Sequence, residues 1–355
     1  MSRRSYANAL AEALATAMER DPAVFVVGEG VPDPGAIFGT TRGLRERFGA
    51  DRVQDMPISE GAMTGVAIGA ALAGLRPVMV HQRMDFLLLA LDQLLNNAAK
   101  WRYMFGGRFS VPLTVRAIVG RGWGQGPQHS QSLQALLAHV PGLEVVLPAT
   151  PADARGMLLA AIEDPDPVVV VEHRWLYGLE EPIPTAPEAL PLRGARIRRA
   201  GRDATLAAFS YMVVEALEVA ERLSPLGIEL EVVDLRCASS LDLPTLLGSV
   251  RRTRRLCVLD TAWTAFGVSA EVVAAVTEHA LGALAAPPVR IGLPRGYPAT
   301  SPHLSAGFYP TPETIAAAVL DLVGAADRSM RREALRRCRR RTPGDVPHAS
   351  FSGPF

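Results

Sequence analysis

Short, uniformly apolar runs rich in valine constrain the fold of this chain more than any other feature. In the first half of the chain they occupy residues 23–29, 77–82, 112–120, 143–149 and 167–174. A strand that is apolar on both sides is buried on both faces, which is typical of a parallel sheet covered by helices. Helical patterns alternate with these runs, at 59–74, 85–107, 130–140 and 152–164. This half therefore predicts a doubly wound parallel α/β domain.

A second α/β pattern follows a proline-rich stretch that has no clean period. Its apolar runs lie at 204–210, 228–236, 254–261 and 288–294, and its last helical pattern lies at 311–326. We expect four parts: a first domain at 1–180, a linker at 181–195, a second domain at 196–326, and a basic helix with a loose tail at 327–355.

Composition excludes several classes of protein. The 355 residues are enough for two domains, and the net charge of +1 gives no electrostatic reason to expect a nucleic-acid or membrane partner. The chain has neither an apolar stretch of the ~20 residues that span a bilayer nor the apolar core of a secretory signal. Its cysteines are widely spaced, so we expect no metal ligands, no disulfides and a cytoplasmic setting: Cys237, Cys257 and Cys338.

Polar residues at the ends of the predicted strands are the first candidates for chemistry, because α/β domains bind ligands there. Ser59 can cap the helix predicted at 59–74, which places Glu60 in its first turn. Glu60 either serves chemistry or only favours the positive helix end. Glu29 directly follows a buried strand, where it is either functional or a solvated strand end.

The glycine-rich segment 120–132 lies between a predicted strand and a predicted helix. It contains Trp123 and His129 but lacks the Lys-Ser/Thr of a P-loop and the spacing of a dinucleotide site. His129 is either an acid–base group or a histidine that caps the next helix. At 81–86, Arg83 either holds a substrate carboxylate or pairs with Asp85, and the residues alone favour the pairing.

Long motifs resemble the beta subunits of the thiamine diphosphate-dependent first component of 2-oxo acid dehydrogenase complexes (pyruvate, branched-chain and acetoin types). The resemblance covers residues 4–325 and is carried by VGEG, GLRERFGADRVQDMPISEGAMTGVAIGAALAGLRPV, DQLLNNAAKWRYMFGG, QHSQSLQALLAHVPGLEVVLPATPADARGMLLAAIEDPDPVVVVEHRWLY and GIELEVVDLR. It implies a transketolase-like pyrimidine-binding domain followed by a transketolase C-terminal-type domain. It also implies an alpha-type partner in an alpha2beta2 heterotetramer, which holds the diphosphate and Mg²⁺. A structural monovalent cation held by backbone carbonyls is a further expectation from the resemblance.

The same resemblance implies roles for individual residues. Glu60 matches the carboxylate that faces the aminopyrimidine ring nitrogen, and Phe86 matches the aromatic residue beside that ring. Glu29 matches a glutamate lining the substrate approach. His129 matches the histidine that assists acyl transfer to a lipoyl acceptor or orients the intermediate. Trp123 and Arg83 depart from the usual pattern, and we expect them to favour a small or polar 2-oxo acid.

Three functions are compatible with these residues. The first is oxidative decarboxylation of a 2-oxo acid with acyl transfer to lipoamide, which adds a lipoyl acyltransferase core as a second partner. The alternative is a two-subunit carboligase or ketol transferase that passes the decarboxylated intermediate to an aldehyde. The third is a non-enzymatic subunit, which the presence of Glu60 and His129 argues against.

The basic segment 327–341, which carries eight arginines, has two interpretations. It is either a solvated, frayed helix or a docking element for an acidic surface on a partner.

Overall fold

The computed structural model describes residues 1–122, 124–340, 344 and 346. These residues form two compact units. The first comprises 1–121 and 128–192, and the second comprises 122, 124–127, 193–340, 344 and 346.

A six-stranded parallel sheet forms the centre of the first unit, with the order β3-β2-β4-β5-β7-β6. Its strands are β2 (Val24–Gly28), β3 (Val53–Gln54), β4 (Arg76–His81), β5 (Thr114–Val119), β6 (Glu144–Val146) and β7 (Val168–His173). Every residue of β5 and β7 is buried. This confirms the parallel α/β fold predicted from the uniformly apolar runs.

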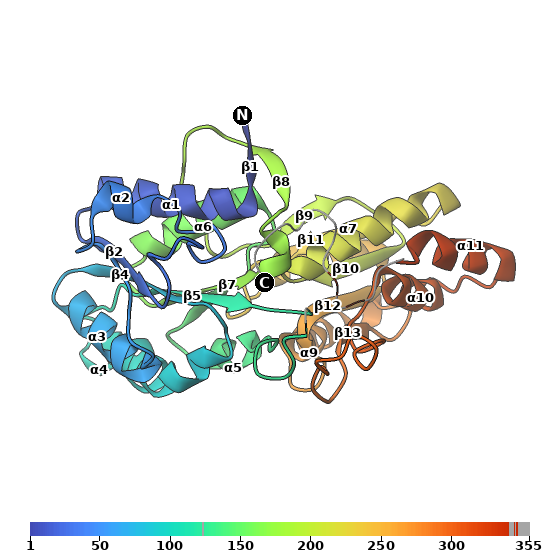
Figure 1. The fold of residues 1–355 in the computed structure, drawn as a ribbon. Coiled ribbons are helices and arrows are strands. Elements are labelled where there is room, and N and C mark those ends of the chain that lie inside the picture. The colour runs from blue at the N-terminus through green and yellow to red at the C-terminus, as the bar shows by residue number, and fades with distance from the viewer. Residues whose placement is uncertain (123, 341–343, 345, 347–355) are drawn as a thin grey trace. The chain divides into compact units, whose positions relative to one another are not determined.

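Helices cover both faces of this sheet (Figure 1). On one side lie α1 (Tyr6–Arg20) and α6 (Pro151–Glu163), and on the other lie α3 (Glu60–Leu72) and α4 (Ala99–Met104). The side chains of Ser5 and Thr150 cap α1 and α6 by accepting hydrogen bonds from backbone N–H groups in their first turns.

Two helical predictions were wrong in their extent. The stretch expected as one helix over 85–107 changes geometry along its length, from the 3₁₀ helix η1 (Phe86–Ala90) through the π-helix η2 (Gln93–Ala98) to α4. The helix expected at 130–140 is only α5 (Gln134–Ala138). Apolar period alone does not separate these helix types, because the repeat of each differs from that of an α-helix by less than one residue per turn.

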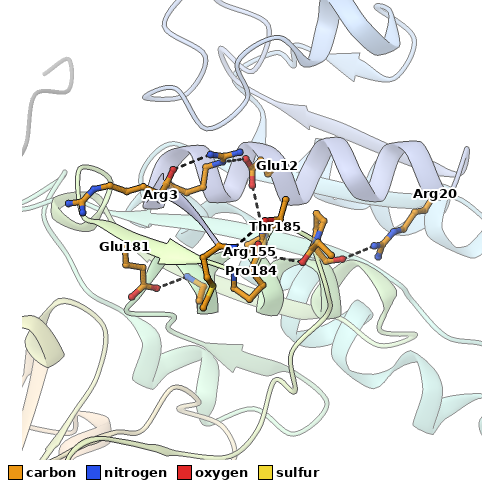
Figure 2. A network of polar contacts seen from close by, with 12 residues as sticks. Arg3, Glu12, Arg20, Arg155, Glu181, Pro184 and Thr185 are labelled. Atoms are coloured by element: carbon orange, nitrogen blue, oxygen red, sulfur yellow. Dashed lines mark hydrogen bonds and ion pairs between the residues drawn. The ribbon is translucent and has the colours of Figure 1, made fainter.

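The end of the first unit is tied back to its beginning. Strand β8 (Glu180–Ile183) pairs antiparallel with β1 (Ser2–Ser5). Beyond it, Arg155 of α6 donates to the carbonyl of Pro184 at 2.6 Å, and Arg20 of α1 donates to that of Pro187 at 2.7 Å (Figure 2). The segment predicted as a linker over 181–195 therefore begins inside a strand.

The second unit contains a mixed five-stranded sheet with the order β13-β12-β10-β11-β9. Its strands are β9 (Arg196–Arg199), β10 (Ala204–Ala208), β11 (Leu230–Asp234), β12 (Leu256–Trp263) and β13 (Val289–Leu293). Strand β9, which the sequence did not predict, pairs antiparallel with β11, and the other pairs are parallel. The helices of this unit are α7 (Tyr211–Leu223), α8 (Leu243–Thr253), α9 (Val268–Ala280), α10 (Pro312–Leu322) and α11 (Arg328–Cys338). The remaining short helices of the chain are α2 (Leu44–Phe48), η3 (Arg174–Leu176), η4 (Ser224–Leu226) and η5 (Leu281–Ala283).

Within the basic segment predicted at 327–341, residues Arg328–Cys338 form α11, which packs against α7 and α10. Arg340, just beyond the helix, donates to the buried carboxylate of Glu215 at 2.7 Å, and Arg331 pairs with Asp321 at 2.6 Å. The helix is therefore packed on one face, whereas Arg328, Arg332, Arg336 and Arg337 are exposed to solvent, and docking to an acidic partner stays a prediction. No helix among the described residues is both long enough and apolar enough to cross a membrane.

Candidate functional site

Charged residues line the carboxyl edge of the first sheet in a definite order. Glu60 follows β3, Glu29 follows β2, Arg83 follows β4, Arg121 follows β5 and Arg174 follows β7. Because the strands are parallel, their carboxyl ends share one edge, the usual ligand edge of such a sheet. The sheet order therefore places two carboxylates at one end of the row and three arginines at the other.

Glu60 is the first residue of α3, and only 4% of it is exposed. A carboxylate in this place interacts with the positive end of the helix. Ser59 occupies the N-cap position as predicted, but its side chain makes no capping hydrogen bond. Gly61 lets the neighbouring backbone approach, because a Cβ there would lie 2.9 Å from the carbonyl oxygen of Leu89. The start of α3 is thus closely packed around a buried acid.

Glu29 lies within electrostatic reach of Glu60. Burial raises the pKa of Glu29, and the charges of Glu60 and Asp55 raise it further. Its Oε1 atom is buried and has no hydrogen-bond partner among the described residues. The backbone beside it is fixed, because the N–H of Gly30 donates to Asp55 Oδ1 at 2.9 Å. An oxygen of this kind requires a hydrogen-bond donor from a ligand, from water or from a partner.

Phe86 and His129 meet although 43 positions separate them in the sequence. Their rings form an edge-to-face pair with centroids 5.4 Å apart. His129 is half-buried and is not the cap of the following helix, because α5 begins at Gln134 with Leu133 as its N-cap. The alternative of a capping histidine is therefore wrong.

Arg83 is half-buried at the start of the segment that carries Phe86. Its guanidinium lies 5.4 Å from the centre of the Phe38 ring and donates to the carbonyl of Gln82 at 2.8 Å. Burial lowers the pKa of Arg83, whereas the charge of Asp85 raises it. The pairing of Arg83 with Asp85 stays a prediction. Asp85 also accepts a hydrogen bond from the side chain of Gln131 at 2.9 Å.

Two residues at this edge were not among the predicted site residues. Arg174 is fully buried and lies 4.0 Å from the centre of the Phe38 ring. His81, the last residue of β4, is also buried, and burial lowers its pKa to about 4. Both sit at the ends of strands that the sequence predicted, and that position is the signal that could have found them. Trp123, a predicted substrate residue, lies outside the described residues.

Comparison with known protein families assigns both parts of the chain to transketolase-type domains. Residues 2–180 match the transketolase pyrimidine-binding domain, and residues 194–315 match the transketolase C-terminal domain. The chain is 43% identical to the beta subunit of acetoin:2,6-dichlorophenolindophenol oxidoreductase from Cupriavidus necator, over 87% of this chain and 94% of that protein. It is 44% identical to a mitochondrial pyruvate dehydrogenase E1 beta-2 subunit from Oryza sativa subsp. japonica, over 80% of this chain and 76% of that one.

This chain belongs to the family of E1 beta subunits, the beta subunits of the first component of pyruvate and acetoin dehydrogenase complexes. A solved structure described as a split-gene transketolase in an inactive beta4 tetramer matches it with a TM-score of 0.72 and 21% identity, covering 91% of this chain and 99% of that chain. At that identity the match supports the fold alone.

The site residues fit the aminopyrimidine end of thiamine diphosphate, the cofactor of this family. Glu60 offers a buried carboxyl group, Glu29 offers a buried oxygen that requires a donor, and Phe86 offers a half-buried aromatic ring. Within the described ranges, no group of three or more His, Cys, Asp or Glu side chains could hold a metal ion.

Proposed function

We propose that this chain is the beta-type subunit of a thiamine diphosphate-dependent 2-oxo acid dehydrogenase. It acts on a small-molecule 2-oxo acid, and the acyl product passes to lipoamide. The observation that carries the proposal is the buried Glu60 at the start of α3, which acts electrostatically on a second carboxylate, Glu29. The Phe86–His129 pair lies beyond the carboxyl ends of β4 and β5 in the same sheet. This arrangement occurs in a chain that is more than 40% identical to E1 beta subunits.

The cofactor, when bound, supplies a carbon nucleophile and takes up the electron pair that departing CO₂ leaves behind. Glu60 hydrogen-bonds the ring nitrogen of the pyrimidine, and its burial keeps water away from that bond. Phe86 packs beside the ring. Glu29 accepts a hydrogen bond at its buried Oε1, on the side from which substrate approaches.

His129 is an acid–base group whose ring contacts Phe86. The two rings are nearly perpendicular, and the residue two positions further on, Gln131, donates a side-chain hydrogen bond to Asp85. We assign it the transfer of a proton during acyl transfer to the lipoyl acceptor. His129→Ala should therefore slow acyl transfer more than CO₂ release.

The remaining partners are proposals of the same kind. An alpha-type subunit in an alpha2beta2 heterotetramer holds the diphosphate and Mg²⁺, and a lipoyl acyltransferase core receives the acyl group. A cytoplasmic location and a structural monovalent cation remain predictions. The family relationship to E1 beta subunits supports the partners.

The test is CO₂ release by this chain co-purified with its alpha-type partner, using a panel of 2-oxo acids with thiamine diphosphate and Mg²⁺. Glu60→Gln should lower the rate by about 100-fold or more, because it removes the acid from the pyrimidine. Glu46→Gln, on the exposed surface of α2, is the matched control. Equal rates for wild type and Glu60→Gln would contradict the proposal. Lipoamide and aldehydes, added in turn, separate the dehydrogenase from a carboligase.

A further inference from the structure

Two segments that carry proposed site residues contact each other beyond the carboxyl ends of β4 and β5. Residues 84–86 include Phe86, and residues 129–133 include His129. The two strands are parallel neighbours, so the segments that follow them reach the same edge of the sheet. The edge-to-face pair of Phe86 and His129, with ring centroids 5.4 Å apart, is one contact between them. A single ring contact constrains the direction of an imidazole only weakly, so the polar contacts decide how firmly His129 is held.

Asp85 joins the two segments through Gln131. The Oδ1 atom of Asp85 accepts a hydrogen bond from the backbone N–H of Gln131 at 3.2 Å and another from the Gln131 side chain at 2.9 Å. The backbone N–H of Leu133 also donates to the sulfur of Met84 at 3.2 Å. His129 thus lies two residues before a backbone amide that is hydrogen-bonded directly to Asp85.

Asp85 is not held in this place as an ordinary helix cap. It occupies the N-cap position of η1, but its side chain makes no capping hydrogen bond. Only 6% of the residue is exposed, and its Oδ2 atom is buried without a hydrogen-bond partner among the described residues. Burial raises the pKa of its carboxyl group, whereas the hydrogen bonds from Gln131 and the charge of His129 lower it. Because burying a carboxylate is costly, its two bonds to another segment indicate a role in fixing that segment.

The carboxylate of Asp85 also brings negative charge to this place. It acts electrostatically on His129 and on Arg83. An imidazole becomes a cation when it takes up a proton, and a carboxylate within reach attracts that cation, as in the acid–histidine pairs of hydrolases. Asp85 therefore offers His129 a fixed backbone and a countercharge. Replacement by asparagine separates the two, because the amide retains an acceptor oxygen for Gln131 and loses the charge.

We infer that Asp85 is a positioning residue for His129 in acyl transfer: it holds the segment of His129 through Gln131 and supplies the negative charge that acts on the imidazole. The inference rests on the proposed function and adds to it a residue that acts through His129. In the acyl-transfer step a carbon–sulfur bond forms with the electron pair that CO₂ leaves behind, and the sulfur–sulfur bond of the lipoyl group breaks. A proton moves from the substrate oxygen to the departing sulfur. His129 carries that proton, and Asp85 keeps the imidazole in place while it does so.

The test measures two rates on the co-purified pair, with the 2-oxo acid that wild type decarboxylates fastest. One is CO₂ release with 2,6-dichlorophenolindophenol as the electron acceptor, and the other is acyl transfer to lipoamide. Asp85→Ala should lower kcat of acyl transfer by about 10- to 100-fold and CO₂ release by less than about threefold. Asp85→Asn should lower acyl transfer by only about three- to tenfold, because it retains the acceptor for Gln131. Asp51→Ala, which removes an exposed carboxylate just before β3, is the matched control and should change neither rate.

Reversing the polarity of the contact between Asp85 and Gln131 gives a second test, which leaves no cavity. Gln131→Glu places two carboxylates together and should slow acyl transfer at least as much as Asp85→Asn does. In Asp85→Asn/Gln131→Glu the asparagine amide donates to the new carboxylate, so acyl transfer should recover by at least about threefold over Gln131→Glu. An equal loss in both rates, or no recovery in the double variant, would overturn the inference.

His129→Ala separates this inference from the proposed function. A positioning residue has no effect without the group that it positions, so Asp85→Asn/His129→Ala should be no slower in acyl transfer than His129→Ala. Losses that multiply would overturn the inference and leave the role of His129 intact, as would unchanged acyl transfer in Asp85→Ala. Unchanged acyl transfer in His129→Ala, or no acyl transfer by wild type, would instead reject the proposed function and the inference together.

Discussion

The ion pair between Arg116 and Glu172 offers the sharpest test of how the site edge is held. Both side chains are fully buried, and the guanidinium donates to the carboxylate at 2.5 and 2.8 Å. The same carboxylate accepts from the Tyr177 hydroxyl at 2.8 Å, and Arg116 also donates to Thr40 at 2.9 Å. Burial lowers the pKa of Arg116, but the attraction of Glu172 outweighs it and the net shift is upward.

Replacing Arg116 with methionine leaves the Glu172 carboxylate buried without its cation. Removing one partner of a buried pair costs about 3–5 kcal/mol. For a domain of this size each kcal/mol lowers the melting temperature by about 2–4 °C, so we expect a fall of roughly 6–20 °C. The loss should exceed that of an exposed pair, which contributes about 0–1 kcal/mol.

Circular dichroism melts of the full chain measure the effect, with Arg102→Met as the exposed-pair control. The double variant Arg116→Met/Glu172→Gln neutralises the carboxylate and keeps an acceptor for Tyr177, so it should recover at least half of the loss. A single variant that melts within about 2 °C of wild type would refute the reasoning. So would a double variant whose destabilisation is the sum of the two single ones.

Three further outcomes follow from the described contacts. The raised pKa of Glu29 means that its ionisation opposes folding, so Glu29→Gln should raise the melting temperature at pH 7. That gain should disappear as the pH falls through the raised pKa of Glu29 towards 4.5, which melts at several pH values would detect. Burial lowers the pKa of His81 from 6.5 to about 4, so the wild type should lose roughly 3 kcal/mol of stability as the pH falls from 6.5 to 4. His81→Phe should remove most of this pH dependence. Arg340→Met leaves the carboxylate of Glu215 buried and should destabilise the chain by about 3 kcal/mol, while Arg328→Met should be neutral in the same denaturant titration. If docking of α11 to a partner is the main role of the segment, both variants should instead weaken complex formation at low salt and leave stability unchanged.

The sequence alone determined the fold class and the two carboxylates. Runs such as 112–120 and 167–174 are apolar throughout, so they predict strands buried on both faces whatever surrounds them. Glu29 directly follows a predicted strand and Glu60 begins a predicted helix, so each is found from its own neighbours in the chain. Their roles came from the family resemblance, because a carboxylate at such a position is more often structural.

The tertiary structure decided which of the remaining residues meet. Arg83 and Arg174 share the Phe38 ring because β5 alone separates their strands, and strand order is not encoded in any local period. Arg340 hydrogen-bonds Glu215, 125 positions earlier in the chain. The basic segment is therefore packed on one face, which the sequence did not indicate. The local sequence pattern indicates whether a segment is buried. Contacts between side chains depend instead on residues that folding brings together from distant parts of the chain. For that reason the sheet and its acids could be predicted from the sequence, and the meeting of Arg83 and Arg174 at the Phe38 ring could not.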